Sequence, residues 1–188
     1  MLVAVVCAVL FTVLLGNNFI EEAPVPSVLS RLVPYCACLM TALTVGMVIL
    51  HYLNDMAFAG SVWLFFLTQC FYIPAVGVMS LLFGWNAANP GVAASRMILF
   101  IPMGFILGGA TSPLMEQSLW VRYFAHFFPL TWEYEFTRDI TLRGAGFWDI
   151  APEFGGFLIY FACLIIVFCL VFYGTRQKEL ARQKEEHA

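Results

Sequence analysis

The stretch FGGFLIYFACLIIVFCLVFYG, residues 154–174, contains no charged side chain. A helix needs about 20 apolar residues to cross roughly 30 Å of hydrocarbon, so this stretch predicts a membrane-spanning helix. Inserting a charged side chain at the bilayer centre costs about 2.5–3.5 kcal/mol on insertion scales. Membrane-spanning helices are therefore long runs without charged residues. A second such run lies between Leu32 and Ser95, where Asp55 carries the only formal charge.

The composition of the whole chain agrees with this reading. Of its 188 residues, 62% are hydrophobic and 11% are charged, and the mean hydropathy is +0.86. A soluble domain is about half apolar and about a quarter charged, so a soluble enzyme and a disordered chain are both excluded as classes. With a net charge of −3, the chain lacks the basic surface that binding to nucleic acid requires. The fold class expected is an all-α integral membrane protein whose partner is the lipid bilayer.

Hydropathy and helix-breaking residues predict about five transmembrane helices. Their approximate bounds are 2–20, 34–53, 61–84, 95–112 and 154–174. The first resembles a signal peptide in length, but no Lys or Arg precedes its apolar part, which favours a span. Residues 1–188 are therefore expected to form a single transmembrane domain.

Basic residues predict the orientation of the chain, because cytoplasmic loops are enriched in Lys and Arg. Five spans place six basic residues on the side of the C-terminus: Arg31, Arg96, Arg176, Lys178, Arg182 and Lys184. The opposite side receives three: Arg122, Arg138 and Arg143. We therefore expect a cytoplasmic tail at residues 175–188, with the N-terminus outside.

Residues 113–153, between the last two spans, are both charged and rich in Trp, Tyr and Phe. Trp and Tyr concentrate where water meets hydrocarbon. Apolar spacing predicts a short interfacial helix over residues 118–128, broken by Pro129, and a second helix over residues 131–142, ended by Gly144. We expect this pair to dip into the outer leaflet as a re-entrant segment.

Three charged residues of the second helix, Glu135, Arg138 and Asp139, stand at positions i, i+3 and i+4. A salt-bridged helix surface is the favoured interpretation. A polar rim that lines an exit path or holds an external gate shut is the alternative. The six cysteines lack zinc-type spacing, and no glycine-rich phosphate loop is present, so no catalytic, metal or cofactor site is expected in the chain.

Five short motifs occur one after another along the chain. They are RLVP at 31–34, FAGS at 58–61, GG at 108–109 followed by SP at 112–113, FPLTW at 128–132, and Arg138-x-Ile-x-Leu-Arg-Gly ending at Gly144. Over residues 30–175 this order resembles the membrane permease of type-2 ATP-binding-cassette (ABC) exporters.

The resemblance implies a plasma-membrane (inner-membrane) protein that forms half of a substrate path. A second permease subunit would complete the path, and separate ABC ATPase subunits would bind and hydrolyse ATP. The resemblance also implies an outer gate and a cytoplasmic docking surface. The gate residues would be Trp120, Phe128, Pro129, Trp132, Glu133, Glu135 and Arg138, and the docking residues would be Arg31 and Arg96.

The sequence departs from the family pattern in places. Ala57 and Ser118 stand where the family usually has proline, and residues 26–31 lead directly into what resembles the third span. The family's extracytoplasmic domain, second span and coupling loop have no counterpart, so we expect a shortened member. The open alternatives are an inactive permease fragment, a non-transporting accessory or assembly protein, and a membrane-embedded enzyme, which the dispersed histidines disfavour.

Overall fold

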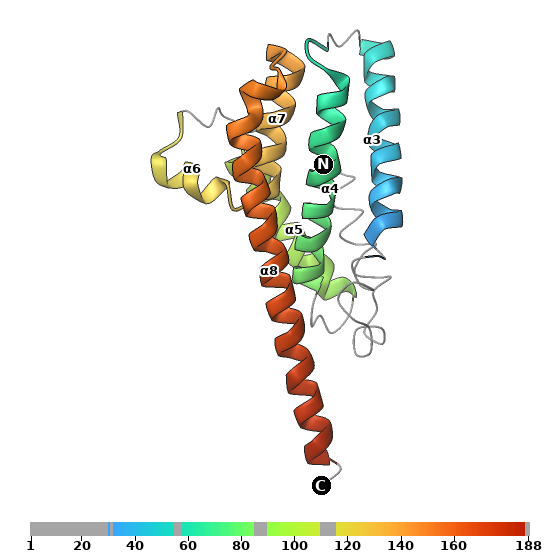
Figure 1. Cartoon of the computed structure of the whole chain (residues 1–188), viewed down its shortest axis with the longest axis vertical. Coiled ribbons are helices and arrows are strands. Elements are labelled where there is room, and N and C mark those ends of the chain that lie inside the picture. Colours follow the sequence, from blue (N-terminus) through green and yellow to red (C-terminus); the bar gives the residue numbers. More distant parts are fainter. Residues whose placement is uncertain (1–29, 31, 55–57, 85–89, 110–115, 187–188) are drawn as a thin grey trace.

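The computed structural model describes residues 30, 32–54, 58–84, 90–109 and 116–186. Their regular structure is entirely helical. The helices, labelled as in Figure 1, are α3 (Leu32–Asn54), α4 (Val62–Gly84), α5 (Pro90–Leu107), α6 (Leu119–Ala125), α7 (Pro129–Arg143) and α8 (Phe147–Glu186). The all-α fold class is thus confirmed for the described part of the chain.

Helix α4 is the centre of the arrangement and packs against α3, α5, α7 and α8. In Figure 1, α7 and the first half of α8 lie beside the upper part of α4, whereas α5 lies beside its lower part. The short α6 projects sideways from the bundle, and the end of α8 extends well below the other helices. Helices α5 and α7 also contact each other. Together they extend along the length of α4 (Figure 1).

Three helical segments of the described chain are long and apolar enough to cross a membrane. They are Leu32–Leu53, Val62–Gly84 and Phe147–Thr175. They coincide with the spans expected at 34–53, 61–84 and 154–174. The span expected at 2–20 lies outside the described residues, so five spans remain a prediction.

The helix that corresponds to the span expected at 95–112 has other bounds, and it is not among the three segments of the described chain that are long and apolar enough to cross a membrane. Helix α5 begins at Pro90 and ends at Leu107. Proline is well suited to the first helical position, because its missing N–H would have no partner there and its φ is already helical. The expected start at residue 95 is therefore too late.

The bounds expected for the last span and the tail also need correction. Helix α8 begins at Phe147, and it continues without interruption to Glu186. Asp149 stabilises the start, because its Oδ2 accepts the backbone N–H of Gly146 at 2.8 Å. The tail KELARQKEE consists largely of strong helix formers, so the helix does not end where the apolar residues end.

Two apolar clusters hold the helices together. The lower one joins α3, α4 and α8 around Leu32, Val78 and Phe168, and the upper one joins α4, α7 and α8 around Phe136 and Phe157. Large apolar side chains are also exposed on the outside of the bundle, among them Trp63 (85%), Ile159 (68%) and Leu170 (67%). Exposed apolar faces of this extent fit a protein whose solvent is lipid.

Candidate functional site

The candidate site is the α6–α7 segment, where the sequence placed an outer gate. Both expected helices are present as α6 and α7; their placement in a membrane leaflet belongs to the proposal below. Pro129 occupies the first turn of α7 and thus starts this helix. Gly144 ends α7 in the left-handed conformation (φ 66°), which glycine adopts without strain.

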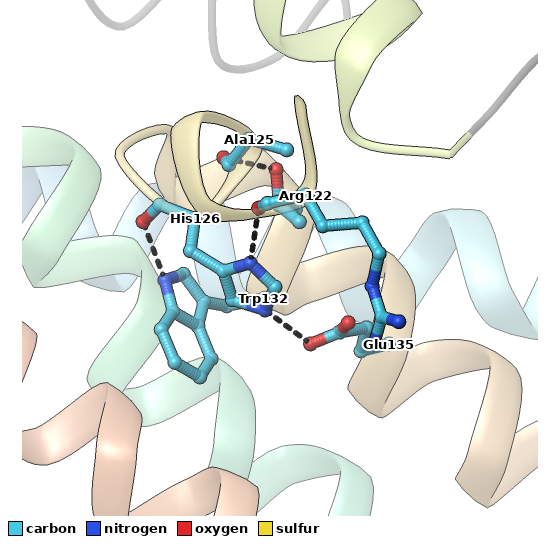
Figure 2. A network of polar contacts seen from close by, with 6 residues as sticks. Arg122, Ala125, His126, Trp132 and Glu135 are labelled. Atoms are coloured by element: carbon cyan, nitrogen blue, oxygen red, sulfur yellow. Dashed lines mark hydrogen bonds and ion pairs between the residues drawn. The ribbon is translucent and has the colours of Figure 1, made fainter. Parts of the chain in front are cut away.

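Side-chain hydrogen bonds fix the turn between α6 and α7. The Thr131 hydroxyl donates to the carbonyl oxygen of Ala125 at 2.6 Å, and the Trp132 indole N–H donates to that of His126 at 3.0 Å. Figure 2 shows both bonds reaching from α7 back to the end of α6. Thr131 is fully buried, and this hydrogen bond satisfies its hydroxyl, which is the only polar group of its side chain. The hairpin is therefore a fixed unit.

His126 and Glu135 form an ion pair across this hairpin (Figure 2). The imidazole Nε2 lies 3.4 Å from Glu135 Oε2, and Nδ1 lies 2.7 Å from the backbone oxygen of Arg122. A neutral imidazole has one N–H and can donate to only one of these acceptors, whereas the protonated ring donates to both. The hydrogen bond to Glu135 accordingly raises the pKa of His126, against a smaller opposing effect of burial. The edge of the ring also packs against Trp132.

A second polar cluster joins α7 to α4. The side-chain amide of Gln69, on α4, is fully buried, and its Nε2 lies 2.8 Å from both carboxylate oxygens of Glu133. The Thr137 hydroxyl donates to Glu133 Oε1 at 2.9 Å. Burial raises the pKa of Glu133, and the two hydrogen bonds oppose this effect only in part. The cluster fastens the middle of α7 to α4.

Helix α7 also contacts the end of α5. Arg138 Nη2 donates to the carbonyl oxygen of Gly109 at 3.0 Å. Gly108 is buried against Thr131, and a Cβ added there would lie 3.1 Å from the Thr131 hydroxyl. Gly108 therefore lets the backbone at the end of α5 approach α7 closely.

The turn between α3 and α4 packs against the end of α7. The backbone N–H of Ala59 donates to the carbonyl oxygen of Thr141 at 3.0 Å. A Cβ added to Gly60 would lie only 2.3 Å from the carbonyl oxygen of Ile140, so no other residue fits there without displacement. The turn thus requires glycine at this position.

The expected salt-bridge surface on α7 is paired differently. Glu135 pairs with His126, and Asp139 pairs with Arg143 at 3.0 Å. Arg138 instead binds a backbone carbonyl. Sequence spacing assigned partners along one helix, whereas two of the three charged side chains find theirs on other segments.

The structure gathers most of the expected gate residues around α7. Phe128, Pro129, Trp132, Glu133, Glu135 and Arg138 all lie at its interfaces with α4, α6 or the end of α5. Trp120 lies on α6 and is 85% exposed, apart from this group. Of the two expected docking residues, Arg31 lies outside the described residues. Arg96 is exposed on α5, and its Nη1 donates to the carbonyl oxygen of Phe83 at 3.2 Å.

Sequence reasoning missed two residues of the site. Gln69 was not singled out, although it is the one amide in the apolar run of α4 and could have been flagged on that ground. His126 counted only as one of the dispersed histidines, and the sequence carries no signal that pairs it with Glu135. Within the described residues, no group of three His, Cys, Asp or Glu side chains is placed to hold a metal ion.

Comparisons with known proteins add no assignment. No family model, no curated protein and no solved structure matches this chain.

Proposed function

We propose that this chain is a transmembrane subunit of an ABC-type exporter. It would form half of a substrate path that separate ATPase subunits drive. The observation that carries the proposal is a convergence: two of the five motifs that resemble the permease family lie along α7, and two others contact it. These are the turn at 58–61, the glycines at 108–109, the segment 128–132, and α7 itself at 138–144.

Contacts among these motifs support a common structural role. Gly60 packs on the carbonyl oxygen of Ile140, Gly108 packs on Thr131, and Arg138 holds the carbonyl of Gly109. Contacts of this kind are expected if the motifs form one structural unit. The proposal therefore rests on a set of mutual contacts as well as on sequence order.

The proposal also assigns an orientation. The α6–α7 hairpin would lie in the outer leaflet as the external gate, and the basic end of α8 would lie in the cytoplasm. ATP binding by the partner subunits would bias the helices between inward-open and outward-open states. No nucleotide site is assigned to the chain itself.

Co-purification tests the assignment. The tagged chain is expressed with a cognate ABC ATPase, solubilised in mild detergent and captured. We expect the ATPase to be retained, and substitution of Arg96 by Glu to weaken its retention. The matched control is Arg143→Glu, which inverts another exposed arginine, on the proposed outer side. Failure to retain any ATPase with folded chain would refute the assignment.

One observation favours a second candidate, a non-transporting accessory subunit. Helix α6 exposes large apolar side chains on its projecting arm, among them Trp120 (85%) and Tyr123 (76%). Such an arm could dock on another membrane protein. In the same capture experiment, this candidate predicts retention of a membrane protein in place of an ATPase, and loss of that retention in Trp120→Ala.

A further inference from the structure

Three large aromatic side chains are exposed at the same end of the helix bundle. Tyr52 lies in the last turn of α3, Trp63 in the first turn of α4 and Trp148 in the first turn of α8. Their exposed fractions are 79%, 85% and 85%. Figure 1 shows the three helix ends at the top of the bundle. The turns there are in contact, because a Cβ added to Gly144 would lie 3.1 Å from the carbonyl oxygen of Ala59.

The chemistry of these side chains identifies the surroundings that fit them. Trp and Tyr each combine an apolar ring with one N–H or O–H group. Because the rings are almost fully exposed, the surroundings have to accommodate both parts. Water would leave the apolar ring unburied, and hydrocarbon would leave the N–H or O–H without a partner. The boundary between lipid headgroups and hydrocarbon accommodates both, and Trp and Tyr are enriched there.

The lengths of α3 and α4 agree with such a boundary. Each helix has 23 residues, which is about 34 Å at 1.5 Å per residue. The hydrocarbon core of a bilayer is about 30 Å thick, and the headgroups bring the total to about 40–45 Å. With the aromatic ends at one boundary, the opposite ends of both helices therefore reach the other.

Helix α8 shows both boundaries in its own sequence. Glu153 is the last charged residue before the uncharged run 154–174, and it lies about 8 Å further along the helix than Trp148. That distance is close to the thickness of one headgroup layer. At the far end of the run, Tyr173 is 55% exposed and stands three residues before Arg176. The uncharged run thus lies between two exposed aromatic residues.

We propose that Tyr52, Trp63 and Trp148 form a lipid-binding belt that fixes the depth of the bundle in the bilayer. The partner of the belt is the boundary between headgroups and hydrocarbon. The α3–α4 and α7–α8 turns then lie in the headgroup layer or beyond it, and the exposed apolar faces below the belt lie in hydrocarbon. This inference depends on exposed side chains and helix lengths, and it stands whether or not the chain is an exporter subunit.

Thiol labelling of the full chain in lipid nanodiscs tests the position of the belt. The probe is a sulfonated maleimide, which reacts from water and does not enter hydrocarbon, and peptide mass spectrometry identifies the labelled residue. Native Cys70 is exposed on α4, about 10 Å below Trp63. We expect it to stay unlabelled in nanodiscs and to be labelled after unfolding in SDS. The matched variant is Ser61→Cys, an exposed position on the other side of Trp63, which should be labelled in nanodiscs.

Fluorescence quenching identifies what covers the rings. Phospholipids with brominated acyl chains quench Trp side chains that they touch, and the same lipid without bromine is the control. We expect brominated lipid to quench the wild-type chain. Trp63→Phe and Trp148→Phe should each reduce the part of the emission that is quenched.

Three outcomes would overturn the proposal. Labelling of native Cys70 in the folded chain, a measurement that needs no variant, would place water against α4 below the belt. Protection of Ser61→Cys would place the boundary beyond the α3–α4 turn. Quenching that neither Trp variant reduces would mean that protein, such as a second copy of the chain, covers Trp63 and Trp148 in place of lipid.

Discussion

Replacing Gly60 by alanine should separate the α3–α4 turn from α7. The added Cβ would lie 2.3 Å from the carbonyl oxygen of Ile140, whereas real Cβ contacts stay above 3.0 Å, so the two backbones must move apart by about 0.7 Å. Overpacking of this kind costs about 1–3 kcal/mol. The movement also weakens the hydrogen bond from Ala59 to Thr141, which contributes about 0.5–1.5 kcal/mol.

The expected destabilisation is therefore about 1.5–4.5 kcal/mol, and at about 2–4 °C per kcal/mol for a chain of this size the thermal midpoint should fall by about 3–18 °C. The assay is thermal unfolding in detergent, followed by circular dichroism. Gly46→Ala is the matched control, because nothing lies within 4 Å of its added Cβ and alanine favours a helix. Equal midpoints for the two variants would refute the close approach of Gly60 to Ile140.

Three further predictions concern the α6–α7 hairpin. The pKa of His126 is raised, so the stability that its pairing with Glu135 contributes is complete below the ordinary histidine pKa and is lost as pH rises through the raised pKa. His126→Asn should therefore flatten the curve of thermal midpoint against pH over this range. Thr131→Val should cost about 0.5–1.5 kcal/mol in urea unfolding, more than the control Thr44→Val, whose hydroxyl bonds only within its own helix. Glu135→Gln and Arg138→Ala share no partner, so their effects should add within about 0.5 kcal/mol in a double-mutant cycle, and a larger coupling would contradict the separate contacts.

Local sequence patterns were sufficient for the elements of the fold. Long uncharged runs gave the three helices able to cross a membrane, because lipid excludes charge along the whole run. Pro129 and Gly144 located the ends of α7, because each residue restricts or permits particular backbone angles. The same patterns misplaced the ends of α5 and α8. Residues that favour a helix continue beyond the apolar run of α8, and a prediction based on hydropathy does not detect them.

Side-chain partners were much less predictable. Gln69 and Glu133 are 64 residues apart in the sequence, and only the packing of α4 on α7 brings them together. Glu135 was expected to pair along its own helix, but the turn at Pro129 folds His126 back to it. Spacing along a helix identifies neighbours within that helix alone, so contacts that depend on tertiary packing require the structure.

The central claim is that this chain transmits the energy of a separate ATPase across the membrane. Its most direct test is ATP hydrolysis by a cognate ABC ATPase in lipid nanodiscs, with and without the chain. We expect the chain to change the hydrolysis rate several-fold, and Gly60→Ala, which loosens α7, to reduce this effect relative to Gly46→Ala. A hydrolysis rate that is the same with folded chain, with an unrelated membrane protein and with empty nanodiscs would contradict the claim.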